Sequence, residues 1–173
     1  GGCGRRRVGG VDLVGGLDKS DAALFSKLCS FGFKIGEIFP LIYDTDHSIY
    51  KDNGITFATI SHMESIGLVH FNHLSGYVQQ GMGQKGFVHY FGSKVWIELA
   101  KPDGNEFKLG HVLLTRAGQE LASICDAQPI NGFIDYVRGK WESLAYKTQP
   151  NTEQAAAVNG TPAAVAAMPS EVP

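Results

Sequence analysis

The chain has 173 residues, of which 43% are hydrophobic and 18% are charged, enough for one packed domain but not for two of full size. Its formal net charge of −2 gives the whole molecule no attraction to nucleic acid or anionic lipid and leaves room only for a local basic patch. No apolar run reaches the ~20 residues that a membrane helix needs. Three widely spaced cysteines do not make a disulfide framework. We therefore expect a cytoplasmic protein with no membrane partner.

The two ends of the chain differ from its middle in composition. Residues 1–16 contain glycines and the run Arg5, Arg6 and Arg7, without the order of regions of a secretory signal. We interpret them as a disordered N-terminal end or as the boundary of a fragment. Residues 147–173 are rich in Ala and Pro, lack aromatic side chains and predict a disordered tail. The folded domain is expected at residues 17–146.

The first predicted elements are a helix and an extended segment. Asp18 or Ser20 can cap a helix that runs to about Phe31. Its apolar positions have the spacing of a buried helical face: Leu24, Phe25, Leu28 and Cys29. Pro40 interrupts the apolar run at residues 38–43, which favours an edge strand or an extended link over a central strand.

A polar, turn-rich segment at residues 44–54 separates this part from a second helix. Thr56 can cap that helix at residues 57–66, and Gly67 supplies its left-handed stop. A short β-like segment at residues 68–72 follows directly.

A loop at residues 73–86 is then expected to lead into two strands, at residues 87–91 and 94–100. The second strand alternates apolar and polar side chains with period two. After a Pro- and Gly-containing turn, residues 107–114 form the returning strand. Residues 94–100 and 107–114 are thus predicted to form a β-hairpin.

Two helices end the predicted domain. Thr115 caps the first, at residues 116–125, and Asn131 begins the second, which runs to about Leu144. The second is amphipathic, with the apolar stripe Phe133, Ile134, Val137, Trp141 and Leu144.

This order of elements resembles a winged-helix domain, in which a short helix precedes a Gly-Leu-Val segment, a two-stranded wing follows, and a Leu-Thr motif opens the closing helix. Residues 66–69 (IGLV) and 114–121 (LTRAGQEL) match in residue type and order. A complete winged helix has a further helix where residues 44–54 lie, and that segment predicts helix poorly. We expect an α+β, winged-helix-like fold in a truncated or altered form.

A second resemblance covers residues 17 to about 141, roughly three quarters of the chain. The segments that carry it are residues 17–22, 28–31, 40–44, 53–55, 62–68 and 114–125. In these the chain resembles a family of uncharacterised bacterial proteins, domain-of-unknown-function family 2806. The resemblance implies no reaction and no site residues.

The glycine motif at residues 81–86 has the G-x-G-x-x-G pattern of nucleotide-binding loops. A dinucleotide fold needs a helix after it, whereas a strand-like run follows here. A protein kinase also needs H-R-D and D-F-G strings, and the sequence contains neither. We interpret the motif as a flexible hairpin loop and expect no cofactor.

Metal binding is also weakly supported. His62, His70 and His73 lie near one another in the sequence, but no cysteine pair accompanies them. Residues 44–48 begin like a calcium loop, yet the loop lacks the glycine and the glutamate needed at its sixth and twelfth positions. We expect no metal site.

No catalytic constellation is evident, so we expect a non-catalytic protein. Cys29 and Cys125 fall on apolar helix faces and are interpreted as core thiols. Asp44 and Asp46 have no visible partner acid or base.

The candidate interaction face lies on the helix at residues 57–66. Its side chains away from the apolar arc are Ala58, Ser61, His62 and Ser65. The helix contains no Lys or Arg, so this neutral face favours a protein–protein contact, a scaffold role or self-association over contact with phosphates.

The alternative is binding to DNA or RNA. The predicted contacts are three lysines of the wing and the basic N-terminal run: Lys94, Lys101, Lys108, Arg5, Arg6 and Arg7. Nearby acidic side chains, Glu98, Asp103 and Glu106, offset the wing lysines.

Overall fold

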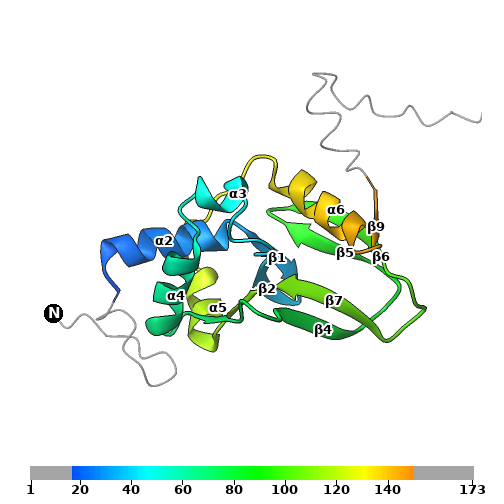
Figure 1. Cartoon of the computed structure of the whole chain (residues 1–173), viewed down its shortest axis with the longest axis horizontal. Helices are drawn as coiled ribbons and strands as arrows, with labels where there is room; N and C mark the ends of the chain where they lie inside the picture. Colours follow the sequence, from blue (N-terminus) through cyan, green and yellow to red (C-terminus); the bar gives the residue numbers. More distant parts are fainter. Residues whose placement is uncertain (1–16, 150–173) are drawn as a thin grey trace, which may run out of the picture.

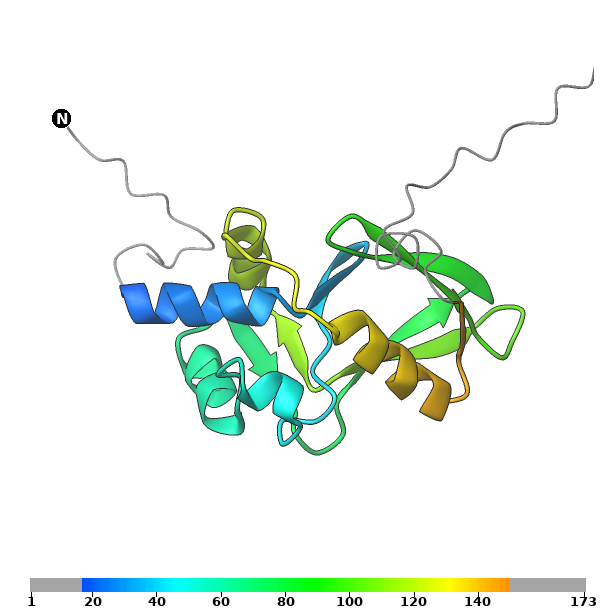
Figure 2. The same ribbon diagram turned by 90° about the horizontal axis from the view of Figure 1, so that it is seen from above.

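The computed structural model describes residues 17–149, so the basic run and most of the predicted tail lie outside the described residues. The helices are α2 (Lys19–Cys29), α3 (Ser48–Lys51), α4 (Phe57–Ser65), α5 (Arg116–Ala122) and α6 (Phe133–Ser143). The strands are β1 (Gly32–Ile35), β2 (Glu37–Pro40), β3 (Val69–Phe71), β4 (Tyr77–Met82), β5 (Lys85–Tyr90), β6 (Ser93–Glu98), β7 (Asn105–Gly110), β8 (Val112–Leu114) and β9 (Lys147–Thr148). Helices α2, α4 and α5 gather at one end, and α6 lies over β5 and β6 (Figures 1 and 2). The α+β class is confirmed.

Helix α2 is capped by Asp18, one of the two predicted caps. Its carboxylate accepts a hydrogen bond of 2.8 Å from the backbone N–H of Asp21. The helix ends at Cys29, earlier than predicted, because the chain turns at once into β1, a strand that the sequence did not predict. A side chain at Gly32 would lie 2.8 Å from Ile38, so the glycine permits this close approach of β2.

Five strands form an antiparallel sheet in the order β2-β1-β5-β6-β9. Strand β2 is at its edge, as predicted. The side-chain amide of Gln119 in α5 forms two hydrogen bonds with that edge: it accepts one from Ile38 N at 3.1 Å and donates one to Ile38 O at 2.7 Å. These bonds satisfy backbone groups that could otherwise pair with a further strand. At the other edge Lys147 and Thr148 pair with β6, two residues beyond the predicted domain boundary.

The predicted β-hairpin of residues 94–100 and 107–114 is wrong. Strand β6 pairs with β5 and β9, whereas β7 pairs with β4, which lies inside the predicted loop at residues 73–86. The returning strand is also divided into β7 and β8, because Gly110 has a φ of +87°. The polar residues and Gly81 of β4 conceal its strand character in the sequence. Because the expected wing does not form, the winged-helix resemblance is not confirmed.

The predicted helix before Gly67 and the Thr115 turn are confirmed, and they lie side by side. Thr56 caps α4 in a capping box with Thr59, and Gly67 has the expected positive φ of +83°. Thr115 donates from its backbone N–H to Leu68 O at 3.0 Å and from its hydroxyl to Gly67 O at 2.7 Å. The pairing of β3 with β8 starts from this contact. Helix α5 ends at Ala122, before the predicted end.

One part of the core lies between α6 and the inner face of the five-stranded sheet, and it is continuous with buried side chains of α2, α4, β3, β7 and β8. Phe133, Val137 and Trp141 of α6 are fully buried, and the predicted amphipathic helix is confirmed, although Gly132 rather than Asn131 is its cap. The Tyr90 hydroxyl donates to Ser30 O at 2.8 Å. Burial raises the pKa of Tyr90 to about 12.

The segment at residues 44–54 contains more order than its turn-rich sequence predicts. His47 caps the single-turn helix α3 by accepting from Ile49 N at 3.1 Å. Tyr50 of this helix is fully buried, and its hydroxyl donates to Leu41 O at 2.6 Å. This contact joins the segment to the end of β2.

Candidate functional site

The face of the five-stranded sheet opposite α6 bears aromatic and basic side chains. Directly opposed residues of antiparallel strands point to the same face, and the residues between them point to the other. Val88, Tyr90, Val95 and Ile97 are buried on the α6 side. The alternate residues form what we call the outer sheet face: Lys34, Lys85, Phe87, His89, Lys94, Trp96, Glu98 and Lys147.

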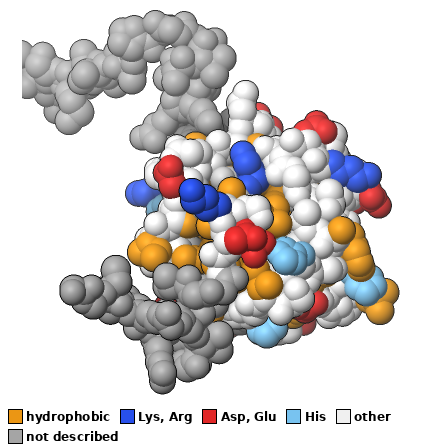
Figure 3. Space-filling model, turned by 90° about the vertical axis from the view of Figure 1, so that its left-hand side faces the viewer, with side chains coloured by type: hydrophobic (Ala, Val, Ile, Leu, Met, Phe, Trp, Pro, Cys, Tyr) orange, Lys and Arg blue, Asp and Glu red, His pale blue; other side chains and the backbone are white. Residues whose placement is uncertain are grey.

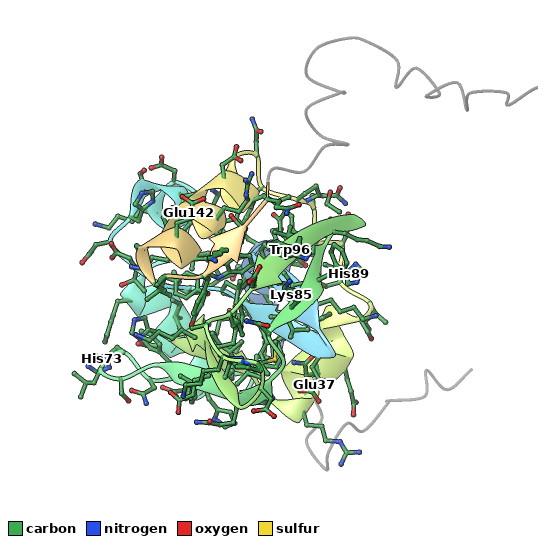
Figure 4. The ribbon with its side chains drawn as sticks, turned by 90° about the vertical axis from the view of Figure 1, so that its right-hand side faces the viewer. Glu37, His73, Lys85, His89, Trp96 and Glu142 are labelled. Carbon is green, nitrogen blue, oxygen red and sulfur yellow. The ribbon has the colours of Figure 1, made fainter. Side chains whose placement is uncertain are left out.

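Two aromatic side chains lie at the centre of the outer sheet face. Phe87 of β5 is directly opposite Trp96 of β6. The Phe87 side chain is 59% exposed, and Trp96 is partly exposed. The Lys94 ammonium lies 6.0 Å from the centre of the Phe87 ring, at the limit of a cation–π contact. Figure 4 shows Lys85, His89 and Trp96 on the neighbouring strands β5 and β6.

Positive charge flanks the aromatic pair at both ends. In one row of the sheet, Lys34 is opposite His89 and His89 is opposite Lys94. In the other row, Glu98 lies between Lys85 and Lys147. Residues 17–149 contain 12 Lys and Arg and 14 Asp and Glu, yet the outer sheet face carries four lysines and one acid. It is therefore basic on a domain that as a whole is not.

A shallow pocket of about 540 Å³ opens at the β1–β5 side of this face. Its lining combines one aromatic ring with basic groups and glycine backbone: Lys34, Ile35, Gly36, Phe87 and His89. Gly36 has a φ of +77°, which allows the one-residue turn between β1 and β2 that forms the pocket rim. The pocket lining thus places one aromatic ring beside basic side chains.

The structure does not bring the predicted nucleic-acid contacts together. Lys94 lies on the outer sheet face, whereas Lys101 is in the β6–β7 turn and Lys108 is on β7, in a different sheet. The arginines at residues 5–7 lie outside the described residues. Sequence reasoning missed Lys34, Lys85, Phe87 and Trp96 as site residues. The alternation within residues 85–98 was the available signal, because it places Lys85, Phe87 and Trp96 on one face of the sheet if β5 and β6 pair.

The predicted interaction face of α4 is largely exposed but is not free of contacts. Ala58, His62 and Ser65 are exposed, and Ser61 is half-buried. His62 Nε2 lies 2.6 Å from the Asp21 carboxylate, so the middle of the face contacts α2. This contact reduces the surface that the helix can offer to a partner.

An apolar cluster lies beside the start of α4. Phe57 stacks edge to face against Phe71 and His73, with ring centres 5.1 and 5.3 Å away. Phe57 is 50% exposed and Leu74 is 85% exposed. Figure 3, which faces the helical end of the molecule, shows hydrophobic and histidine side chains together at one margin. We call the three mutually packed rings of Phe57, Phe71 and His73, together with Leu74, which follows His73 in the chain, the apolar cluster.

The remaining motifs do not converge on a site. The glycine motif spans the end of β4 and the start of β5, and a strand rather than a helix follows it. His62 contacts Asp21, His70 is on β3 and His73 belongs to the apolar cluster. Within residues 17–149, no three His, Cys, Asp or Glu side chains are placed to hold one metal ion.

Comparison with known proteins identifies the family. Neither the curated proteins nor the solved structures gave a match. Among the described residues, no helix has the length and apolarity needed to cross a membrane. The family model described as protein of unknown function (DUF2806) matches residues 4–138, which confirms the resemblance drawn from the sequence. The chain therefore belongs to the DUF2806 family.

Proposed function

We propose that the protein binds single-stranded nucleic acid across the outer sheet face, without catalysing a reaction. The observation that carries this proposal is the exposed Phe87 ring opposite the partly exposed Trp96 ring, with lysines at both ends. Proteins that bind single strands stack bases on exposed aromatic rings and attract the backbone with basic side chains.

The spacing on the sheet supports the same ligand. Two residues along an antiparallel strand span about 7 Å. Lys94 and Lys85 are each two residues from the aromatic pair, in opposite directions. Phosphates on either side of a base stacked on Phe87 or Trp96 would thus lie within reach of a lysine. Sequence-specific binding to duplex DNA is less well supported, because α4 contains no Lys or Arg side chain that could contact bases in the major groove.

Fluorescence anisotropy with labelled single-stranded RNA, single-stranded DNA and duplex DNA tests the proposal. We expect the single strands to bind more tightly than the duplex. Phe87→Ala and Trp96→Ala should each weaken binding by about 1–3 kcal/mol, because each removes a stacking surface. Lys94→Gln should make the binding constant less dependent on salt. The slope of its logarithm against the logarithm of the salt concentration should fall by about one, which corresponds to the loss of one phosphate contact.

Lys101→Gln is the matched control, because Lys101 is exposed but lies away from the outer sheet face. It should leave the affinity nearly unchanged, and circular dichroism should show all variants folded. Wild-type protein that binds none of the three nucleic acids, or Phe87→Ala protein that binds like wild type, would contradict the proposal.

A second candidate function is self-association through the apolar cluster, next to the neutral face of α4. The exposure of Phe57 and Leu74 favours it, because neighbouring exposed apolar side chains mark contact surfaces. Light scattering should then show a mass that rises with protein concentration. Leu74→Ser should abolish the rise, whereas Ile124→Ser, at an exposed apolar residue outside the cluster, should preserve it. A wild-type protein that stays monomeric at every concentration would exclude this function.

A further inference from the structure

The side chains of the outer sheet face form three rows that cross its strands. The first row consists of basic side chains: Lys34, His89 and Lys94. The second row is the aromatic pair. The third row contains the acidic side chain of this face, Glu98, which is opposite Lys85 on β5 and Lys147 on β9. Successive rows are two residues apart along the strands, or about 7 Å.

Glu98 is partly exposed and is not paired with its neighbours. The ion pairs within residues 17–149 join other side chains, although Glu98 has a lysine on each side. An ionised carboxylate repels phosphates and can only accept hydrogen bonds. If the face binds a polyanion, the carboxylate therefore needs a hydrogen-bond donor from the ligand, and in a nucleic acid the bases supply such donors.

The order of the three rows determines how a nucleotide can lie on the face. The first row, which has no acidic member, attracts the phosphates, and a base attached to that backbone stacks on the aromatic pair. The Watson–Crick edge of a base lies away from its sugar and phosphate, so it extends toward the third row. There Glu98 and Lys85 are directly opposite each other and offer an acceptor beside a donor.

Guanine matches this acceptor and donor better than the other bases. Its Watson–Crick edge has two adjacent donors, N1–H and the N2 amino group, beside the acceptor O6. A carboxylate can accept from both donors through its two oxygens, while a lysine ammonium donates to O6. Adenine and cytosine offer the carboxylate only one amino group, and the carbonyl oxygens on either side of uracil N3–H repel it.

We propose that Glu98, together with Lys85, selects guanine in the single strand that the outer sheet face binds. This inference rests on the proposed function, because it requires a base stacked on Phe87 or Trp96. Glu98→Gln removes the paired acceptor and also removes a negative charge that repels phosphates. The substitution should therefore abolish the preference for guanine without weakening binding to a strand that lacks guanine.

The first test compares bases on the unaltered whole chain. Fluorescence anisotropy measures binding of an oligouridine and of the same strand with one central guanine, adenine, cytosine or inosine. The guanine strand should bind on the order of tenfold more tightly than the oligouridine, as expected for one bidentate base contact. Inosine lacks only the N2 amino group, so its strand should fall between them. The corresponding DNA strands, built on oligothymidine, should give the same order because the base edges are the same.

The second test assigns the preference to Glu98. Glu98→Gln protein should bind the oligouridine at least as tightly as wild type and should gain nothing from the guanine. Asp103→Asn is the matched control, because it removes the same charge from the exposed β6–β7 turn, and it should keep the preference.

Equal binding of all the strands by wild type, or a guanine preference that survives Glu98→Gln, would overturn this inference and leave the proposed function intact. Wild-type protein that binds no single strand would overturn both. The comparison of bases needs no substitution, so a variant that failed to fold would not affect it.

Discussion

Replacing Trp141 with alanine is expected to lower the free energy of unfolding by about 3–5 kcal/mol. The side chain is fully buried and packs edge to face against Phe33 and Phe107, with ring centres 5.7 and 5.5 Å away. Its indole N–H donates to the Tyr43 hydroxyl at 2.9 Å. The substitution therefore opens a large cavity and removes a buried hydrogen bond. Because domains of this size have about 5–15 kcal/mol of stability, urea unfolding followed by circular dichroism will resolve the loss.

Trp96→Ala is the matched control, because it removes the same side chain from the outer sheet face. It should cost about 1 kcal/mol or less, as for a surface substitution that leaves no cavity. Trp141→Phe should fall between the two, because it keeps most of the packing but leaves the Tyr43 hydroxyl without its donor. Equal losses for Trp141→Ala and Trp96→Ala would contradict the arrangement of α6 against the inner face of the sheet.

Gly110→Ala is expected to lower the free energy of unfolding by about 2–4 kcal/mol. Gly110 has a φ of +87°, which a residue with a Cβ atom adopts only at a cost. An added Cβ would also lie 2.4 Å from the carbonyl oxygen of Ile42, so the backbone must move. That same oxygen accepts a hydrogen bond of 2.8 Å from His111 N, and the movement would disturb it. Thermal unfolding by calorimetry measures the effect.

Gly139→Ala is the control for the glycine substitution, and its expected sign is opposite. Gly139 is exposed inside α6, and no atom lies within 4 Å of an added Cβ. Alanine should stabilise the helix by about 0.5–1 kcal/mol, because it is the better helix former and restricts the unfolded chain. If Gly110→Ala were also neutral or stabilising, the close passage of residues 41–43 against β7 would be wrong.

Gly110 and Tyr43, the hydrogen-bond partner of Trp141, both belong to the contact between the segment after β2 and strand β7. Ile42 bridges to Gly110 next to the His111 hydrogen bond, and the Tyr43 hydroxyl donates to Lys108 O at 2.8 Å. Burial raises the pKa of Tyr43 above the usual range, which keeps this donor protonated. The contact joins the five-stranded sheet to the β4–β7 pair, and the winged-helix resemblance did not lead us to expect it.

The sequence by itself determined the longer helices and their starts. Asp18, Thr56 and Thr115 cap the helices at which they were expected, because a cap bonds only to backbone groups two or three residues away. The apolar stripe of α6 likewise predicts its buried face, because the spacing of apolar residues along a helix depends only on residues a few turns apart. Pro40 favoured an edge strand or an extended link, and β2 is an edge strand. This inference is also local, because proline has no backbone N–H to donate to a neighbouring strand. The family resemblance also came from these local segments.

Only the tertiary structure decided which strands are partners, and with them the candidate site. Strand β7 lies close in sequence to β6 but pairs with β4, and Lys34 of the unexpected strand β1 is opposite His89 of β5. Period-two alternation shows which side chains share a face of one strand but carries no information on the neighbour. The outer sheet face therefore emerges only when distant strands pair.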